Sequence, residues 1–287
     1  MKKGVYGLFK LLNISYKNKM EIYQSIILGA VQGLTEFLPI SSSAHLNVFP
    51  WILNWQPLSD GMDVALHIGT LLALIIFFFK DWVNLVKAGY KKVIKKQDST
   101  DGKIFWYLVI ATIPAGILSL ILDKISSKII GENINVQMFI IAISLIIMGI
   151  LLYIADKKSK STTDYEHISL KQAVIIGISQ AFAAAFPGVS RSGITMTIAR
   201  ALKVDREGAA KFSFMLAMPI TLAAVVFDLD KFQFDLSLIL GILTSFIVGF
   251  LIIKFLMNYL KKGSFKAFAI YRIIFGIVII ALALIRM

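Results

Sequence analysis

The sequence predicts an all-α polytopic membrane protein with an inverted-topology repeat, in which each half is a re-entrant helical hairpin followed by three transmembrane helices. Three observations lead to this fold class. Hydrophobic residues make up 57% of the 287 residues and charged residues only 16%, which is too apolar for a water-soluble domain of this length. Six stretches are long and apolar enough to span a bilayer. Two further apolar stretches are interrupted at the centre, and their sequences match one another.

The six spans follow from length and hydropathy. A spanning helix needs about 20 mostly apolar residues to cross about 30 Å of hydrocarbon. The ranges that meet this requirement are 63–79, 104–122, 136–154, 208–227, 236–257 and 268–285. The interrupted stretches are 21–55 and 169–204, each broken by Pro, Gly, Ser and an ionisable residue. We expect one membrane domain over 1–287, with a first repeat over 20–154 and a second, inverted repeat over 168–287.

The charges predict how the spans are oriented. Lysines cluster in the segments 80–103, 157–160 and 261–266, and short basic loops face the cytoplasm. The span 63–79 ends at the first of these cytoplasmic segments, so it begins outside. The basic extension 1–19 is then outside if 21–55 is a hairpin, and inside if 21–55 is a full span. We favour the hairpin, with residues 5–16 as a basic amphipathic helix on the membrane surface and no cleavable signal peptide.

Charge and cysteine content exclude several functions. The net charge of +13 lies mainly in loops between apolar runs, where it indicates topology and contact with anionic lipids, so we expect no nucleic-acid binding. The chain has no cysteine. Disulfides, thiolate catalysis, zinc–thiolate sites and iron–sulfur clusters are therefore excluded.

The internal repeat places the two interruptions in corresponding positions. A shift of 148 residues aligns Gln24 with Gln172, Gly29 with Gly177, Gln32 with Gln180, Pro39 with Pro187 and Ser42 with Ser190. Three spans after each hairpin invert the second half relative to the first. Such repeats place broken helices near the midplane, where irregular backbone is tolerated if it lines a polar cavity. The alternative is that Pro39 and Pro187 only kink ordinary spans, which leaves the adjacent polar residues unexplained.

The first break, QGLTEFLPISSSAH at residues 32–45, carries an acidic group. Gln32 and Glu36 are four residues apart and share one helical face. A carboxylate within a membrane needs a cation, a metal or a proton relay.

Hydroxyl groups follow in the same motif. Ser41, Ser42 and Ser43 begin a new half-helix, where free N–H groups and the helix dipole favour an anion. His45 lies three residues after Ser42, so a nucleophile with an acid or base partner is one interpretation. Helix capping by the serines and a structural histidine are the other interpretations.

The second break, PGVSRSGIT at residues 187–195, carries a basic group. Gly188 and Gly193 permit tight turns. Arg191, between Ser190 and Ser192, needs an anionic partner in this apolar stretch, and its planar fork suits phosphate oxygens. Alternatively, Arg191 extends to the membrane interface or pairs with Glu36.

Together the two breaks predict a phosphate-binding centre within the membrane. The candidate ligands are hard oxygens, so a bound metal would be Mg²⁺ or Ca²⁺. A phosphate substrate at this depth needs a long lipid tail. Asp63 and His67 share a face near the external start of a span and are weaker candidates for this site, and His167 lies in a basic loop.

The two break motifs resemble the signature motifs of the undecaprenyl-diphosphatase family, also called bacitracin-resistance proteins. The resemblance extends to DVALHIGTLLA from Asp63 and KFSFMLAMP from Lys211. It implies hydrolysis of undecaprenyl diphosphate to undecaprenyl phosphate and inorganic phosphate with a divalent cation. It also implies a multi-pass protein of the bacterial plasma membrane with a site open to the extracytoplasmic side. This activity recycles the lipid carrier for peptidoglycan synthesis and confers bacitracin resistance. A homodimer is left open.

The resemblance also implies residue roles. Catalysis is expected from Glu36, Ser42, His45 and Arg191. Phosphate binding is expected from Ser41, Ser43, Gly188, Ser190, Ser192 and Thr195. Glu36 and Gln32 are expected to hold the cation, although Gln32 leaves one carboxylate where some family members have two.

In the expected reaction, Ser42 attacks the terminal phosphorus or orients the attacking water, and His45 carries the proton. A rival function is a polyprenyl-phosphate transporter or flippase that uses the same site without hydrolysis, because inverted repeats with broken helices are common in transporters.

Overall fold

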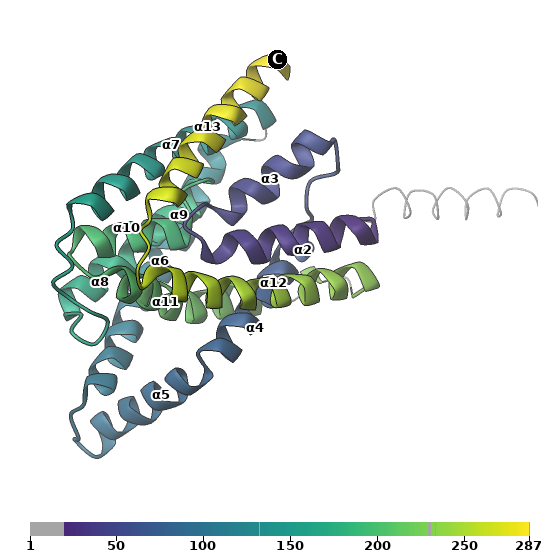
Figure 1. Ribbon diagram of the computed structural model, residues 1–287. Helices are drawn as coiled ribbons and strands as arrows, with labels where there is room; N and C mark the ends of the chain where they lie inside the picture. The colour runs from purple at the N-terminus through teal and green to yellow at the C-terminus, as the bar shows by residue number, and fades with distance from the viewer. Residues whose placement is uncertain (1–19, 132, 229–230, 233, 287) are drawn as a thin grey trace, which may run out of the picture.

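The computed structural model describes residues 20–131, 133–228, 231–232 and 234–286, so the expectations for the extension 1–19 lie outside the described residues. The described part of the chain forms twelve helices, labelled α2 to α13, and one isolated β-bridge between Thr163 and Val204 (Figure 1). Six of these helices are long and apolar enough to cross a membrane. The prediction of an all-helical protein with six long spans is therefore confirmed.

The six long helices coincide with the six predicted spans. They are α4 (Asp60–Phe77), α6 (Thr100–Ile130), α7 (Ile134–Lys158), α11 (Arg206–Phe227), α12 (Leu236–Leu260) and α13 (Lys266–Arg286). Most begin a few residues before the apolar run, because a polar residue there caps the helix. Ser59, Ser99, Asn133, Asp205 and Asp235 each accept a hydrogen bond from a backbone N–H of the first turn.

Residues 80–103 were predicted from their lysines to form a basic loop, but most of this segment is helical. Helix α5 (Phe79–Ile94) continues from the end of α4 away from the bundle before the chain turns back into α6 (Figure 1). It buries Leu85 and Gly89, and Trp106 Nε1 of α6 donates to the Gly89 carbonyl at 3.2 Å. Its lysines obscured an amphipathic pattern that this contact with α6 stabilises.

Both interrupted stretches divide into short helices. The first gives α2 (Ile22–Phe37) and α3 (Ser42–Leu53), and the second gives α8 (Leu170–Ser179), α9 (Ala181–Ala185) and α10 (Arg191–Ala201). At 1.5 Å per residue, even the 16 residues of α2 reach only about 24 Å. At each break one helix therefore ends and a new helix begins. Neither stretch is a continuous helix with a proline kink.

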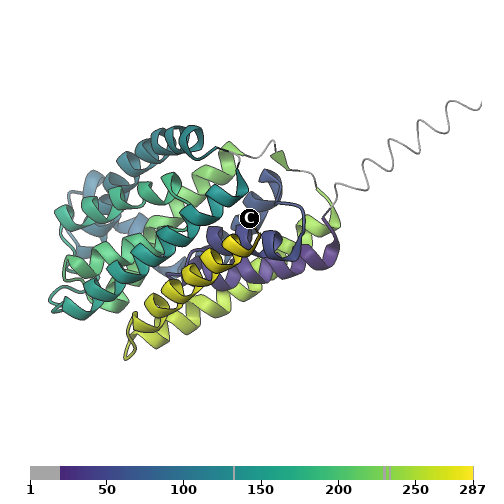
Figure 2. The same ribbon diagram turned by 90° about the horizontal axis from the view of Figure 1, so that it is seen from above.

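Glycines allow close packing around the two breaks. A Cβ on Gly29 would lie 2.6 Å from the Gly241 carbonyl oxygen, and one on Gly33 would lie 2.7 Å from the Gly249 nitrogen, so α2 runs directly against α12. Helix α13 packs along α7, where a Cβ on Gly276 would lie 2.7 Å from the Ala142 carbonyl oxygen (Figure 2). Small residues commonly form such helix contacts in membranes. This packing brings the turns after α2 and α9 together inside the bundle.

Candidate active site

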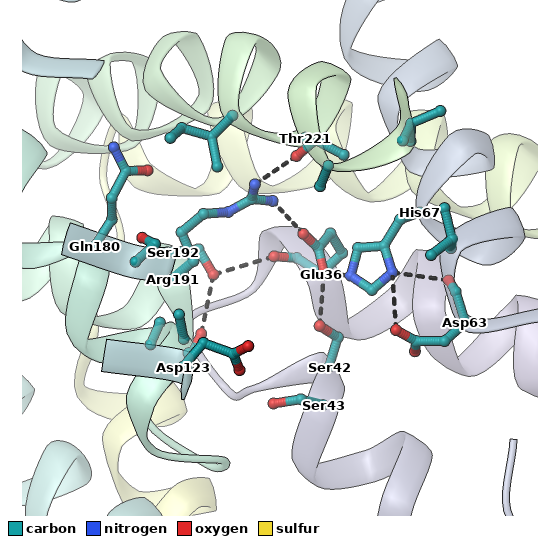
Figure 3. Close-up of a pocket in the computed structure, with 18 of the residues that line it drawn as sticks. Glu36, Ser42, Ser43, Asp63, His67, Asp123, Gln180, Arg191, Ser192 and Thr221 are labelled. Carbon is teal, nitrogen blue, oxygen red and sulfur yellow. Dashed lines mark hydrogen bonds and ion pairs between the residues drawn. The ribbon is translucent and has the colours of Figure 1, made fainter. Parts of the chain in front are cut away.

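A cavity of about 460 Å³ lies where the two breaks meet. It is lined from both breaks by Glu36, Ser42, Ser43, Ser190, Arg191 and Ser192, with further residues from α4, α6, α9 and α11. Figure 3 shows the polar side chains around it. Six of the residues that the sequence assigned to the site thus line one cavity, although they lie about 150 residues apart in the chain.

Glu36 is the central group of this cavity. Its Oε1 forms an ion pair with Arg191 of the other break. Its Oε2 accepts hydrogen bonds from Ser42 Oγ at 2.5 Å and from Gln32 Nε2 at 3.2 Å. The Glu36 side chain is only 6% exposed, and a buried carboxylate needs such partners to stay ionised. One carboxylate therefore joins the hydroxyl of one break to the guanidinium of the other.

Arg191 is held by two elements but stays accessible from the cavity. Besides Glu36, it donates to Thr221 Oγ1 at 2.5 Å and to the Ala217 carbonyl at 3.4 Å, both on α11. Its side chain is 21% exposed. The ion pair with Glu36 was the alternative interpretation of Arg191, and it is present. It leaves part of the guanidinium facing the cavity, where a phosphate can bind beside it.

The helices α3 and α10 restart in the same way. Ser41 (φ 76°) and Ser190 (φ 71°) are their N-caps, and each Oγ accepts from the backbone N–H three residues later. Each of these Oγ atoms also lies 3.2 Å from the hydroxyl oxygen of the serine two residues later in the chain. In the structure Ser190 therefore corresponds to Ser41, and Arg191 corresponds to Ser42. The alignment of the two sequences with a shift of 148 residues paired Ser190 with Ser42 instead, so it is displaced by one residue here. The second break has one more residue between proline and cap, which an alignment without gaps cannot represent.

Several predicted phosphate-binding residues lie behind the cavity. Ser41 is fully buried and caps α3. Thr195 Oγ1 donates to the Arg191 carbonyl at 2.8 Å. Gly188 has φ +92°, and a Cβ there would lie 2.6 Å from the Ile141 carbonyl oxygen. None of the three is a lining residue of this cavity. They shape the turns, whereas Ser43, Ser190 and Ser192 line it.

His45 also lies behind the cavity, packed against α13. Its ring is stacked on Phe275 at 4.5 Å and on Tyr271 at 5.7 Å between centroids. Its Nδ1 is 2.6 Å from the Ser41 carbonyl oxygen, and its Nε2 is 2.7 Å from the Tyr271 hydroxyl. The residue is 3% exposed. Both ring nitrogens are thus engaged in contacts that hold the first turn.

His67 is the histidine that faces Glu36 within the cavity (Figure 3). Its Nε2 is 3.7 Å from Glu36 Oε2. Its Nδ1 is 2.9 Å from the Asp63 carbonyl oxygen and 3.8 Å from the Asp63 carboxylate. Side-chain exposure rises from 6% at Glu36 to 28% at His67 and 48% at Asp63. These three groups connect the buried carboxylate with water.

Glu36 and Gln32, the residues predicted to hold a cation, offer no free carboxylate oxygen. Both Glu36 oxygens have partners. Gln32 Oε1 has no hydrogen-bond partner among the described residues, but Gln32 is fully buried and is not a lining residue. Within the described ranges, no three His, Asp or Glu side chains could together hold a metal. This arrangement does not fit a cation held by these two side chains.

Several polar residues of the site were not predicted from the sequence. Thr221 holds Arg191, and Asp123, Gln180 and Asp228 line the cavity. Arg272 of α13 is fully buried and donates to the carbonyls of both turns. Arg272 could have been found, because an arginine inside an otherwise apolar span needs a functional or structural partner. Gln180 also had a signal, because the repeat aligns it with Gln32. Thr221 had none, because single hydroxyl groups are common in spans.

Comparisons with known proteins agree with the geometry. Residues 25–278 match the family described as bacitracin resistance protein BacA. Proteins named undecaprenyl-diphosphatase include one from Caldicellulosiruptor bescii, 44% identical over 272 residues, which are 93% of this chain and 99% of that protein. One from Pelotomaculum thermopropionicum is 42% identical over 93% of this chain and 98% of that protein. One from Desulforudis audaxviator is 42% identical over 93% of this chain and all of that protein.

Proposed function

The chain belongs to the BacA family of bacitracin resistance proteins, and from this we propose that it is an undecaprenyl-diphosphatase. It is an integral membrane enzyme that hydrolyses undecaprenyl diphosphate to undecaprenyl phosphate and inorganic phosphate. The observation that supports this function at the cavity is the contact of Glu36 with both Ser42 and Arg191. The reaction supplies lipid carrier for peptidoglycan synthesis and underlies bacitracin resistance.

Ser42 and Glu36 are arranged for nucleophilic attack. Ser42 Oγ forms a bond to the terminal phosphorus, and its proton passes to Glu36 Oε2, 2.5 Å away. The bond between that phosphorus and the bridging oxygen breaks, so undecaprenyl phosphate leaves with the oxygen. Water then cleaves the phosphoserine, which releases inorganic phosphate and returns a proton to Ser42. The alternative in which Ser42 orients an attacking water uses the same Glu36 as base.

Arg191 supplies the positive charge for the phosphate. Its guanidinium can bind two phosphate oxygens, and the first N–H groups of α3 and α10, at Ser42, Ser43, Arg191 and Ser192, have no intrahelical acceptor. Donors fixed before the reaction stabilise charge that develops on the phosphoryl oxygens. The hydroxyl groups of Ser43 and Ser190 complete this lining.

The proton that Glu36 accepts needs a route to water. His67 lies beside Glu36 and leads to the half-exposed Asp63. His45, the histidine expected to carry the proton, has both ring nitrogens engaged away from the cavity. The contacts therefore favour His67 for this task and a structural task for His45.

We propose that the cavity opens to the extracytoplasmic side of the plasma membrane. Asp63 near the start of α4, Asp123 in α6 and Asp228 just after α11 all line it. These chain positions are the ones that the charge distribution places outside, whereas the lysine-rich segments lie at the other ends of the same helices.

We also propose that the two halves form an inverted repeat with re-entrant hairpins. Helix α2 packs on α12, and its counterpart α8 packs on α6, the counterpart of α12. Likewise α4 packs on α12 and α11 on α6. Helices α7 and α13 are antiparallel, since Gly149 lies against Ala269 and Arg272 while Gly276 lies against Ala142. A two-fold exchange of the halves accounts for each of these pairs.

The requirement for Mg²⁺ or Ca²⁺ stays a prediction from the resemblance. Mg²⁺ at such sites is usually bound by one or two protein carboxylates together with phosphate oxygens and water, whereas Ca²⁺ takes six to eight oxygen ligands. Phosphate release in Mg²⁺, Ca²⁺ or EDTA tests the requirement, and full activity in EDTA would contradict it. A homodimer and the absence of nucleic-acid binding also stay predictions.

Release of inorganic phosphate from undecaprenyl diphosphate by the purified protein in detergent tests the function. A transporter that only binds the headgroup gives none. We expect release by the wild type and loss of at least about 100-fold in kcat for Ser42→Ala. A folded wild type that binds the lipid without releasing phosphate would favour the transporter.

A further inference from the structure

Arg272 occupies an unusual place for a charged residue. It lies on α13, which is otherwise apolar at this depth, and is fully buried. Burying a charge in a membrane is unfavourable unless its donors are satisfied. Its hydrogen bonds therefore indicate what the residue does.

The guanidinium of Arg272 binds both broken segments at once. Nη1 donates to the Pro39 carbonyl at 3.1 Å. Nη2 donates to the carbonyls of Gly188 at 2.8 Å and Val189 at 2.9 Å. Nε reaches the Leu145 carbonyl of α7 at 3.4 Å. Pro39 lies two residues before the cap of α3, and Val189 directly precedes the cap of α10.

The neighbouring backbone leaves space for this side chain. A Cβ on Gly193 would lie 2.4 Å from Arg272 Nη1, so a side chain there would force the guanidinium to move from this position. Gly193 and Gly188 were both found in the sequence as turn residues of the second break. Gly193 thereby leaves room for Arg272 between the two turns, whereas Gly188 packs against Ile141 of α7.

Arg272 has no ion pair with a carboxylate among the residues that the structure describes, unlike the other fully buried arginine. Arg200 is 1% exposed and binds the Asp156 carboxylate at 2.9 Å. Arg272 instead donates four hydrogen bonds to neutral carbonyl oxygens. Its positive charge therefore lies behind the two turns without a neutralising acid, which favours an anion on their other side.

We propose that Arg272 is a positioning residue, which fixes the two turns relative to each other so that Ser42 and Arg191 converge on one phosphate. The inference rests on the proposed function, because it assigns Arg272 a role in that site. Arg272 does not touch the substrate and acts through the turns. Small displacements of reacting groups reduce rates by up to about 100-fold, so the relative position of the turns matters for catalysis.

Lysine substitution tests the proposal, because an ammonium keeps the charge but cannot span carbonyls on three segments. We expect Arg272→Lys to lower kcat by about 10- to 100-fold with a smaller change in KM. The matched control is Arg200→Lys, at the other fully buried arginine, which we expect to lower thermal stability while kcat of the folded enzyme stays unchanged.

A second variant separates positioning from folding. Gly193→Ala keeps Arg272 but pushes its guanidinium away from Pro39, so we expect the same loss in kcat. Unchanged kcat in folded Arg272→Lys or Gly193→Ala would overturn the proposal. If Arg272→Lys does not fold, the kcat of Gly193→Ala alone tests the proposal.

Binding of inorganic diphosphate gives a readout that does not need catalysis. We expect inorganic diphosphate to raise the thermal midpoint of the wild type, and to raise that of Gly193→Ala clearly less. Equal shifts in both would contradict the proposal. A wild type that is stabilised by diphosphate but releases no phosphate from the lipid would refute the proposed function and leave this test of Arg272 valid.

Discussion

At the scale of single residues, the site is built around one carboxylate that satisfies several donors. Glu36 accepts a hydrogen bond from Ser42 and pairs with Arg191, and so links the proposed nucleophile to the proposed phosphate-binding group. The sequence predicted each of these three residues from its type and place beside a break. It did not decide whether Arg191 faces a phosphate or Glu36, because that depends on how two distant segments meet.

The first prediction concerns the base. Glu36→Gln keeps the shape but cannot accept the Ser42 proton, so we expect kcat to fall by about 100- to 10,000-fold. Phosphate release from undecaprenyl diphosphate measures it. The control is Glu207→Gln at the first turn of α11, outside the lining of this cavity. A Glu36→Gln enzyme with more than a tenth of wild-type kcat would show that another group removes the proton.

The second prediction separates the two histidines. His67 faces Glu36 in the cavity, whereas His45 is packed behind the first turn. We expect His67→Ala to change the pH profile of kcat and to be partly rescued by added imidazole, because the cavity admits a small base. The charged groups facing His67 are Glu36 and Asp63, with Arg191 nearby.

His45→Ala is the comparison for this pair. We expect it to lower thermal stability, and imidazole to restore nothing, because the ring is buried in an aromatic stack. Rescue of His45→Ala but not of His67→Ala would reverse the assignment and support the family-based expectation.

At the scale of helices, apolar length predicted the six spans, but not what lies between them. The span limits came from length and hydropathy and hold within four residues, except that α6 ends at Ile130, eight residues beyond the predicted limit. Capping side chains decide where each helix starts. Helix α5 was missed because its stability depends on burying Leu85 and Gly89 against α6. Such tertiary contacts are not visible in the hydropathy of one segment.

The third prediction concerns the lysine-rich end, where Asp156 holds three elements together. Its carboxylate binds Arg200 and Arg206 and accepts from the Phe265 backbone N–H at 3.1 Å. Asp156 is 5% exposed. Asp156→Ala leaves a buried arginine without its partner, so we expect a loss of about 3–5 kcal/mol in the free energy of unfolding.

Unfolding in detergent, followed by circular dichroism, measures this loss. Asp164→Ala is the matched control, because its ion pair with His167 is exposed and such pairs contribute about 0–1 kcal/mol. Equal stability of the two variants would mean that the Asp156 cluster does not hold the helix ends.

At the scale of the whole molecule, the site exists because two breaks far apart in the chain meet. Neither break alone contains both a carboxylate and an arginine. Only the packing of α2 on α12 and of α8 on α6 brings the turns to one cavity. The repeat predicted that the breaks meet. It could not predict Arg272 as their link, because Arg272 lies outside both repeated motifs.

The last prediction tests the topology, and the absence of natural cysteines makes it direct. If 21–55 is a re-entrant hairpin, Glu21→Cys and Gln56→Cys lie on one side of the membrane. If it is a full span, they lie on opposite sides. We expect both to react with a membrane-impermeant thiol reagent in whole cells, because the chain continues from Gln56 into the end of α4 that the charge distribution predicts to lie outside.

The second half gives the mirror-image result. Lys171→Cys and Lys203→Cys flank the other broken stretch and are exposed. Both should react only after the cells are opened, because the proposed inverted repeat would place this hairpin on the cytoplasmic side. Labelling of Lys171→Cys and Lys203→Cys from opposite sides would make 169–204 a full span. Labelling of all four from one side would contradict the inversion, and the two turns could not then approach the midplane from opposite faces.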